Sequence, residues 1–137
     1  MDRSIIKKMI NMAKEVSKNA YAPYSNFNVG ACVLAEDDSY YTGVNVENVS
    51  YGATCCAERN AVYAAVLKGN KKIKAIAVFA FTNIPVTPCG ICRQVIYEFS
   101  NADTVIICSD KNENYKEYKI NEILPLAFGS DSLNDNK

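Results

Sequence analysis

The feature that most constrains the fold is a continuous apolar run over residues 73–82, IKAIAVFAFT. It is partly β-branched and almost free of polar residues, which is typical of a strand that is covered on both faces of a sheet. A second short run, TVIICS over residues 104–109, has the same character. The sequence therefore predicts an α/β fold in which helices cover buried central strands.

Hydrophobic periodicity and turn residues place the remaining elements around these two strands. The order of elements indicates one layered α/β domain over residues 1–137, without a repeat or a linker. In chain order we expect a helix over 3–19, strands over 29–35 and 40–46, a helix over 56–67 that stops at Gly69, the strand over 73–82, a helix over 89–100, the strand over 104–109, an edge strand over 115–120, a short helical segment over 121–128 and a frayed, flexible tail over 129–137.

Composition limits the classes of partner. Fifteen basic and fifteen acidic residues cancel, whereas proteins that bind nucleic acid or anionic membranes usually carry a basic excess. The N-terminal segment interleaves charges with apolar residues, and no apolar run reaches the length of a membrane span. We therefore expect a cytoplasmic protein that binds neither nucleic acid nor membranes. In that compartment its six cysteines are thiols or metal ligands rather than disulfides.

Two cysteine motifs carry the chemistry. Pro88-Cys89-Gly90-Ile91-Cys92 contains a CxxC pair, which is compatible with a structural zinc site, a redox dithiol or a catalytic metal site. The chain has no histidine, and it has no second CxxC to complete a four-ligand structural site. A redox pair would leave the other motif, TCCAERNA with Cys56 and Glu58, unexplained.

Both motifs fall where helices are expected to begin. Side chains two residues apart, such as Cys56 and Glu58, diverge by about 200° on a helix, so they serve one site only if that site lies beyond the helix end. Cys89 and Cys92, three apart, share a face of the next helix. Two helix N-termini can thus direct three thiolates at one Zn²⁺ and leave its fourth tetrahedral position open, which is typical of a catalytic zinc.

Two charged residues complete this hypothesis. Glu58 beside a zinc-bound water is placed to act as a general acid and base; its structural alternative is a first-turn glutamate that stabilises the helix dipole. Three thiolates give zinc a net charge of −1, so we expect Arg59 to donate hydrogen bonds to the sulfurs. Its alternative is a surface arginine. Cys32, Cys55 and Cys108 are interpreted as small apolar side chains that fill space.

These residues match a known signature. Zinc nucleobase deaminases carry a Cys or His, any residue and Glu, followed at a distance by Pro-Cys-x-x-Cys. This chain has Cys56-Ala57-Glu58 and Pro88 to Cys92, followed by Arg93-Gln94. From about Tyr21 to Phe128 it resembles the small, homotetrameric cytidine deaminases with an all-cysteine zinc site.

The resemblance implies a fold and a reaction. The fold would be the α/β/α three-layer sandwich of cytidine deaminases, with a mixed five-stranded sheet, and each subunit would hold one Zn²⁺. An activated water would attack C4 of cytosine while Glu58 shuttles protons to N3 and to the leaving amine. Cytidine and 2′-deoxycytidine would become uridine and 2′-deoxyuridine with release of ammonia, a step of pyrimidine salvage.

The resemblance also implies substrate contacts. Asn45 and Glu47 in the NVEN segment would hydrogen-bond the 3′-hydroxyl of the sugar, and their spacing of two places both on one face of a strand. The Phe27 ring would pack against the base; its structural alternative is an ordinary phenylalanine of the hydrophobic core. Ala57 would offer its backbone to the base edge. Tyr51 and Phe128 match positions that the family brings in from neighbouring subunits.

Three rival functions remain open from the sequence. A deaminase of a nucleoside antibiotic such as blasticidin S shares the zinc motif, but typically lacks the pairing of NxEN with CAER. A polynucleotide-editing deaminase is disfavoured by the zero net charge. A non-catalytic zinc-binding module would need Cys55 or Cys108 as a fourth sulfur ligand.

Overall fold

A mixed five-stranded sheet forms the centre of the computed structural model, which describes residues 1–134. The strand order is β2-β1-β3-β4-β5; β3 and β4 are parallel, and every other neighbouring pair is antiparallel. The elements are α1 (Arg3–Ser17), β1 (Val29–Ala35), β2 (Tyr40–Val44), a 3₁₀ turn (Tyr51–Ala53), α2 (Ala57–Leu67), β3 (Ile73–Ala80), α3 (Gly90–Glu98), β4 (Val105–Ser109), β5 (Tyr115–Lys119), α4 (Ile120–Ile123) and α5 (Ser130–Asn134).

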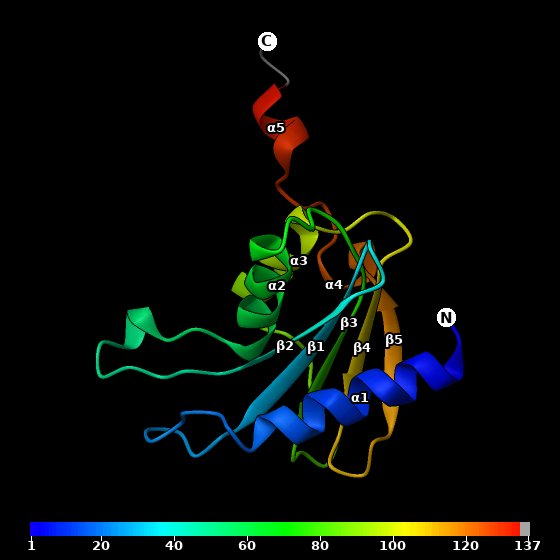
Figure 1. Cartoon of the computed structure of the whole chain (residues 1–137). Coiled ribbons are helices and arrows are strands. Elements are labelled where there is room, and N and C mark those ends of the chain that lie inside the picture. The colour runs from blue at the N-terminus through cyan, green and yellow to red at the C-terminus, as the bar shows by residue number, and fades with distance from the viewer. Residues whose placement is uncertain (135–137) are drawn as a thin grey trace.

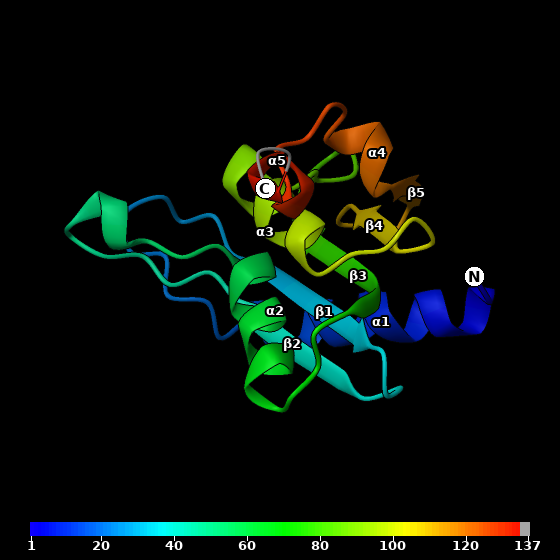
Figure 2. The same ribbon diagram turned by 90° about the horizontal axis from the view of Figure 1, so that it is seen from above.

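Helices cover both faces of the sheet, as predicted. Figure 1 shows α1 across one face and α2 with α3 on the other, so the expected α/β/α three-layer sandwich is confirmed. Figure 2 shows the same layers from above, with α5 over α3. The apolar run over 73–82 forms β3, which lies between β1 and β4 in the middle of the sheet.

Each face of the sheet has its own hydrophobic core. On one face the apolar stripe of α1 (Ile6, Met9, Ile10, Ala13) packs on side chains of β1, β3 and β4 that include Cys32 and Phe79. On the other face the α2 residues Ala61, Val62 and Ala65 pack with Ile76, Val78 and Ile106. The strands alternate between these cores because successive side chains point to opposite faces, and this is why β3 is apolar at almost every position.

A glycine in β2 brings α2 close to the sheet. A Cβ atom added at Gly43 would lie 2.4 Å from the backbone nitrogen of Ala61 and 2.6 Å from the carbonyl oxygen of Ala57. Any larger residue at this position would push the helix away. Because Ala57 is the first residue of α2, Gly43 helps to determine where this helix begins.

Two elements end earlier than the sequence predicted. The predicted strand over 40–46 ends at Val44, because the chain then leaves β1 and Val46 pairs instead with Tyr21 and Cys55. The predicted helical segment over 121–128 shrinks to α4. Its last residue lies two positions before Pro125, and a residue that precedes proline disfavours helical backbone angles.

The segment over 129–137, where a frayed tail is predicted, begins with a short helix that the sequence analysis did not expect. Ser130–Asn134 forms the short exposed helix α5, which begins where the Gly129 backbone N–H donates to the Ser132 hydroxyl at 3.3 Å. Residues 135–137 of that prediction lie outside the described residues. Within residues 1–134, none of the helices combines the length and the apolarity that crossing a bilayer requires.

We predict that Gly43→Ala destabilises the protein by about 1–3 kcal/mol, the usual cost of an overpacked site, because its methyl group meets only backbone atoms of α2. The free energy of unfolding in urea measures this effect. Gly52→Ala is the control, since a Cβ atom there has no neighbour within 4 Å. Equal stability of the two variants would contradict the close contact between β2 and α2.

Candidate metal centre

Two helix N-termini meet at one end of the sheet. Because β1 pairs antiparallel with both β2 and β3, these two strands run in the same direction. The segments that follow β2 and β3 therefore emerge at the same end of the sheet, beyond the carboxyl ends of these strands. Ligand sites of layered α/β proteins form at such a position. The first segment leads to the start of α2 and the second leads to the start of α3.

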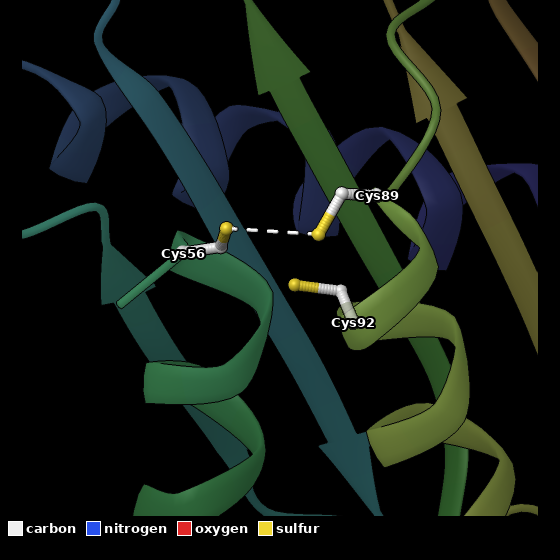
Figure 3. Close-up of side chains that lie close together, drawn as sticks. All are labelled: Cys56, Cys89 and Cys92. Carbon is white, nitrogen blue, oxygen red and sulfur yellow. Dashed lines mark hydrogen bonds between the residues drawn. The ribbon is translucent and has the colours of Figure 1, made fainter. Parts of the chain in front are cut away.

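The cysteines lie at these helix starts, as the motifs predicted. Cys56 is the N-cap of α2 and Cys89 is the N-cap of α3, both with extended backbone angles, and Cys92 lies in the first turn of α3. Figure 3 shows the three side chains converging from the two helices. The positive ends of both helix dipoles therefore face the sulfurs and favour thiolates.

The geometry of the sulfurs fits a tetrahedral metal ion. The three Sγ atoms all lie within 4.8 Å of one another, and those of Cys56 and Cys89 are 3.8 Å apart. Ligands about 2.3 Å from a tetrahedral zinc are about 3.8 Å from one another. Sulfur donors are among those that zinc prefers. Neither Cys55 nor Cys108 belongs to this cluster of described residues, so the cluster itself offers three sulfurs and not four.

Arg59 faces the sulfurs. Its guanidinium donates to Cys56 Sγ at 3.4 Å and to the Thr54 carbonyl oxygen at 3.5 Å. Hydrogen bonds from the Cys92 thiol and from Arg59 lower the pKa of Cys56. The arginine charge is thus placed to offset the excess negative charge of three thiolates around a divalent ion.

Glu58 is buried beside the cysteines. Its side chain is 5% exposed, and it lines the same cavity as Cys56 and Cys89. Loss of water around the carboxylate raises the pKa of Glu58 to about 7. A carboxyl group with such a pKa exchanges its proton readily near neutral pH, which suits general acid and base catalysis.

The cavity beside the cysteines has a volume of about 270 Å³. It brings together residues from four separate parts of the chain that the sequence analysis had grouped. The lining contains the predicted Phe27, Asn45, Glu47, Cys56, Ala57, Glu58 and Cys89. A larger hollow of about 350 Å³ lies beside α3, α4 and α5, and its lining contains none of these residues.

Asn45 and Glu47 both reach the cavity, although they lie just beyond the end of β2. The chain stays extended through the bridge at Val46, so the spacing of two still places the side chains of Asn45 and Glu47 on the same side. Phe27 is 44% exposed, which rules out the alternative of a core phenylalanine.

Two predicted residues lie outside their own chain's cavity. Tyr51 is 76% exposed and Phe128 is 60% exposed, and neither belongs to the cavity lining. Tyr51 begins the 3₁₀ turn, and its ring makes an edge contact with Tyr24. The segment between β2 and α2, which contains this turn, projects from the sheet in Figures 1 and 2. Phe128 precedes α5, and its carbonyl oxygen accepts a hydrogen bond from Gln94 at 2.8 Å.

Some residues of the site were missed from the sequence. Arg93 links Pro88 to α4, since Nε donates to the Pro88 carbonyl oxygen at 2.7 Å and Nη1 donates to the Ile123 carbonyl oxygen at 2.8 Å. Its position after CxxC was the available signal. The cavity is also lined by Ser25, Val29, Thr54, Val78, Val86 and Thr87. Of these, Thr54 lies within the TCCAERNA motif, whereas Val78 reaches the cavity only through sheet pairing.

Comparison with known proteins agrees with this geometry. The family model described as the cytidine and deoxycytidylate deaminase zinc-binding region matches residues 3–109. The chain belongs to this family. The cytidine deaminase of Halalkalibacterium halodurans is 44% identical over 135 residues, which cover 98% of this chain and 100% of that protein. That of Sporosarcina psychrophila is 44% identical over 128 residues, 93% of this chain and 94% of that protein.

Solved structures of the family share the fold. The cytidine deaminase from Burkholderia pseudomallei superimposes with a TM-score of 0.86 at 38% identity, over 93% of this chain and 100% of that chain. The enzyme from Mycobacterium tuberculosis gives 0.79 at 36% identity, over 90% and 96%. Both the resemblance drawn from the two cysteine motifs and the expected fold are therefore confirmed.

We predict that Cys89→Ser lowers zinc affinity by more than the roughly 10- to 100-fold that loss of an outer-shell partner costs. Zinc per chain after dialysis against a chelator, measured by mass spectrometry, checks this. Cys89 is exposed, so the exchange leaves the core intact. Cys55→Ser is the matched control, because Cys55 neighbours the site without joining the sulfur cluster. Equal loss of zinc in both variants would contradict a three-sulfur site.

Proposed function

We propose that this protein hydrolytically deaminates cytidine and 2′-deoxycytidine to uridine and 2′-deoxyuridine, with release of ammonia. The observation that carries this proposal is one cavity that is lined by Cys56 and Cys89 of the three-sulfur cluster, by the buried Glu58 and by the polar residues Asn45 and Glu47. Family membership supports the same activity, because the relatives reported above are cytidine deaminases.

One Zn²⁺ per chain would be held by Cys56, Cys89 and Cys92. Such an ion supplies a polarised water at its open coordination position. Three thiolates make zinc a weaker Lewis acid than histidine ligands would. Arg59, which donates to Cys56 Sγ at 3.4 Å, would withdraw part of the sulfur charge. The partial positive charges of the two helix N-termini would also withdraw charge from the sulfurs.

Glu58 would move the protons of the reaction. Its carboxylate would take a proton from the attacking water and deliver it to N3 of the cytosine ring. It would then take the proton of the new C4 hydroxyl and deliver it to the amine, which leaves C4 as ammonia while the C4 carbonyl forms. Because burial raises the pKa of Glu58 to about 7, the carboxyl group can both accept and donate a proton near neutral pH. Glu58 does not bind the metal in this role, which agrees with the deaminase signature.

The remaining cavity residues would bind the nucleoside. The backbone amide and carbonyl of Ala57, at the start of α2, would contact the polar edge of the base, while the Phe27 ring packs on its face. Asn45 and Glu47 would bind the 3′-hydroxyl of the sugar. Their common placement in the lining of the cavity supports these roles.

Tyr51 and Phe128 would complete the cavity of a neighbouring subunit in a homotetramer. Their exposure and their absence from the lining of their own cavity support this assignment. Gln94 and Tyr24, which contact Phe128 and Tyr51, would hold them for this purpose. We also propose that the enzyme acts in the cytoplasm, in pyrimidine salvage.

We predict that purified protein converts cytidine to uridine, which lowers absorbance at the cytosine band. Glu58→Gln should lower kcat by about 10²- to 10⁴-fold, the usual contribution of general acid and base catalysis, because an amide cannot carry the proton. Zinc content should stay unchanged, since Glu58 is outside the sulfur cluster. Activity close to that of the original protein would contradict the role of Glu58. A wild-type protein that binds zinc without deaminating cytidine would instead indicate a non-catalytic module.

A further prediction concerns the shared site. Phe128→Ala should be nearly inactive by itself, as should Glu58→Gln. If Phe128 serves a neighbouring site, co-expression of the two variants should restore about a quarter of the native sites by random assortment in a symmetric oligomer. Activity measured on the mixed assembly, with its size from sedimentation, checks this. An inactive mixed assembly would contradict the contribution of Phe128 to a neighbour.

A further inference from the structure

Asn45 and Glu47 are both hydrogen-bonded to the segment 24–29, which contributes Ser25, Phe27 and Val29 to the lining of the cavity. The Asn45 side chain accepts from the Val29 N–H at 2.9 Å and donates to the Phe27 carbonyl oxygen at 2.7 Å. Glu47 Oε1 accepts from the backbone N–H groups of Tyr24 at 3.0 Å and Ser25 at 3.1 Å. Both side chains are thus oriented before any substrate binds.

The remaining hydrogen-bonding capacity can be counted. A carboxylate has about four acceptor directions. The two backbone groups occupy Oε1 of Glu47, and the Ser25 hydroxyl donates to Oε2. One acceptor direction therefore remains, on Oε2. The amide of Asn45 donates one of its two hydrogens to Phe27 and keeps the other. Together the two residues present one acceptor and one donor, the complement of a single hydroxyl group.

The Ser25 hydroxyl leaves Oε2 of Glu47 with a single free acceptor direction. This hydroxyl accepts from the Phe27 N–H at 3.0 Å, so its own hydrogen is directed to Glu47 Oε2. Asn26, between them, has a φ of 55° and donates its N–H to the Ala22 carbonyl oxygen at 3.0 Å. Asparagine tolerates this left-handed conformation better than most residues, and the resulting turn sets Ser25 and Phe27 side by side.

The hydroxyl of Ser25 also acts on the charge of Glu47. The hydrogen bond from Ser25 lowers the pKa of Glu47, so the side chain remains an ionised acceptor. Ser25 itself lines the cavity, next to the residues that it orients.

We propose that Ser25 is a positioning residue for sugar recognition, whose hydroxyl holds Glu47 so that one carboxylate oxygen accepts a single hydrogen bond from the 3′-hydroxyl. This inference rests on the proposed nucleoside deaminase function. Loss of the Ser25 hydroxyl frees Glu47 Oε2 to rotate or to bind water, and the bond to the sugar weakens. Ring chemistry at the metal centre is unaffected, because Ser25 contacts neither the sulfurs nor Glu58.

The test compares Ser25→Ala with the original protein on cytidine and on 2′,3′-dideoxycytidine, which lacks the 3′-hydroxyl. For cytidine we expect KM to rise about tenfold, the scale of one hydrogen bond to a charged group, with kcat changed less than twofold. For the dideoxynucleoside we expect kcat/KM to change less than twofold. The selectivity between the two substrates should therefore fall about tenfold.

Two control variants separate positioning from folding. Ser25→Thr keeps the hydroxyl and should restore most of the selectivity. Ser50→Ala removes a hydroxyl that makes no capping bond at the neighbouring 3₁₀ turn, and it should behave like the original protein.

An equal loss on both substrates, or no loss on either, would overturn the role of Ser25. Failure of the proposed function is a different result, since the unmodified protein would then not deaminate cytidine at all.

Discussion

The whole site depends on two helix N-termini that lie close together at the carboxyl ends of β2 and β3. β2 and β3 run in the same direction because β1 lies antiparallel between them. The chain therefore enters α2 and α3 from the same side, and Gly43 lets α2 lie close on β2. This arrangement brings the three sulfurs within 4.8 Å of one another. A metal ion would then join the two helices, so metal binding and the alignment of the helices support each other.

Charge determines how such a site can work. Three thiolates outweigh a divalent ion, and Arg59 supplies the compensating charge at 3.4 Å from Cys56 Sγ. The buried Glu58 gains a pKa of about 7 from the loss of water. Burial thus makes ionisation of the glutamate harder, whereas the hydrogen bond from Arg59 favours the thiolate of Cys56. The polar end of the cavity, at Asn45 and Glu47, is instead held by backbone groups of the segment 24–29.

Much of this could be predicted from local sequence patterns. Period-2 and period-3.6 apolar patterns located the sheet and the main helices, and the CAE and PCxxC motifs located both helix starts to within a residue. The end of β2, the helix α5 and the role of Arg93 were missed, because each depends on contacts between distant segments or on a single local capping bond. The same reason applies to the network around Ser25. Its two partners are 2 and 22 residues away, and only the folded chain brings Glu47 to it.

The most direct test of the central claim is X-ray absorption at the zinc edge on the purified protein. We predict a first shell of three sulfur atoms at about 2.3 Å and one oxygen or nitrogen atom at about 2.0 Å, the pattern of a ligand set with an exchangeable position. Addition of a cytidine analogue that mimics the hydrated base should perturb the light-atom contribution and leave the three sulfurs in place. A shell of four sulfurs, or a protein that retains no zinc, would contradict a catalytic centre built from Cys56, Cys89 and Cys92.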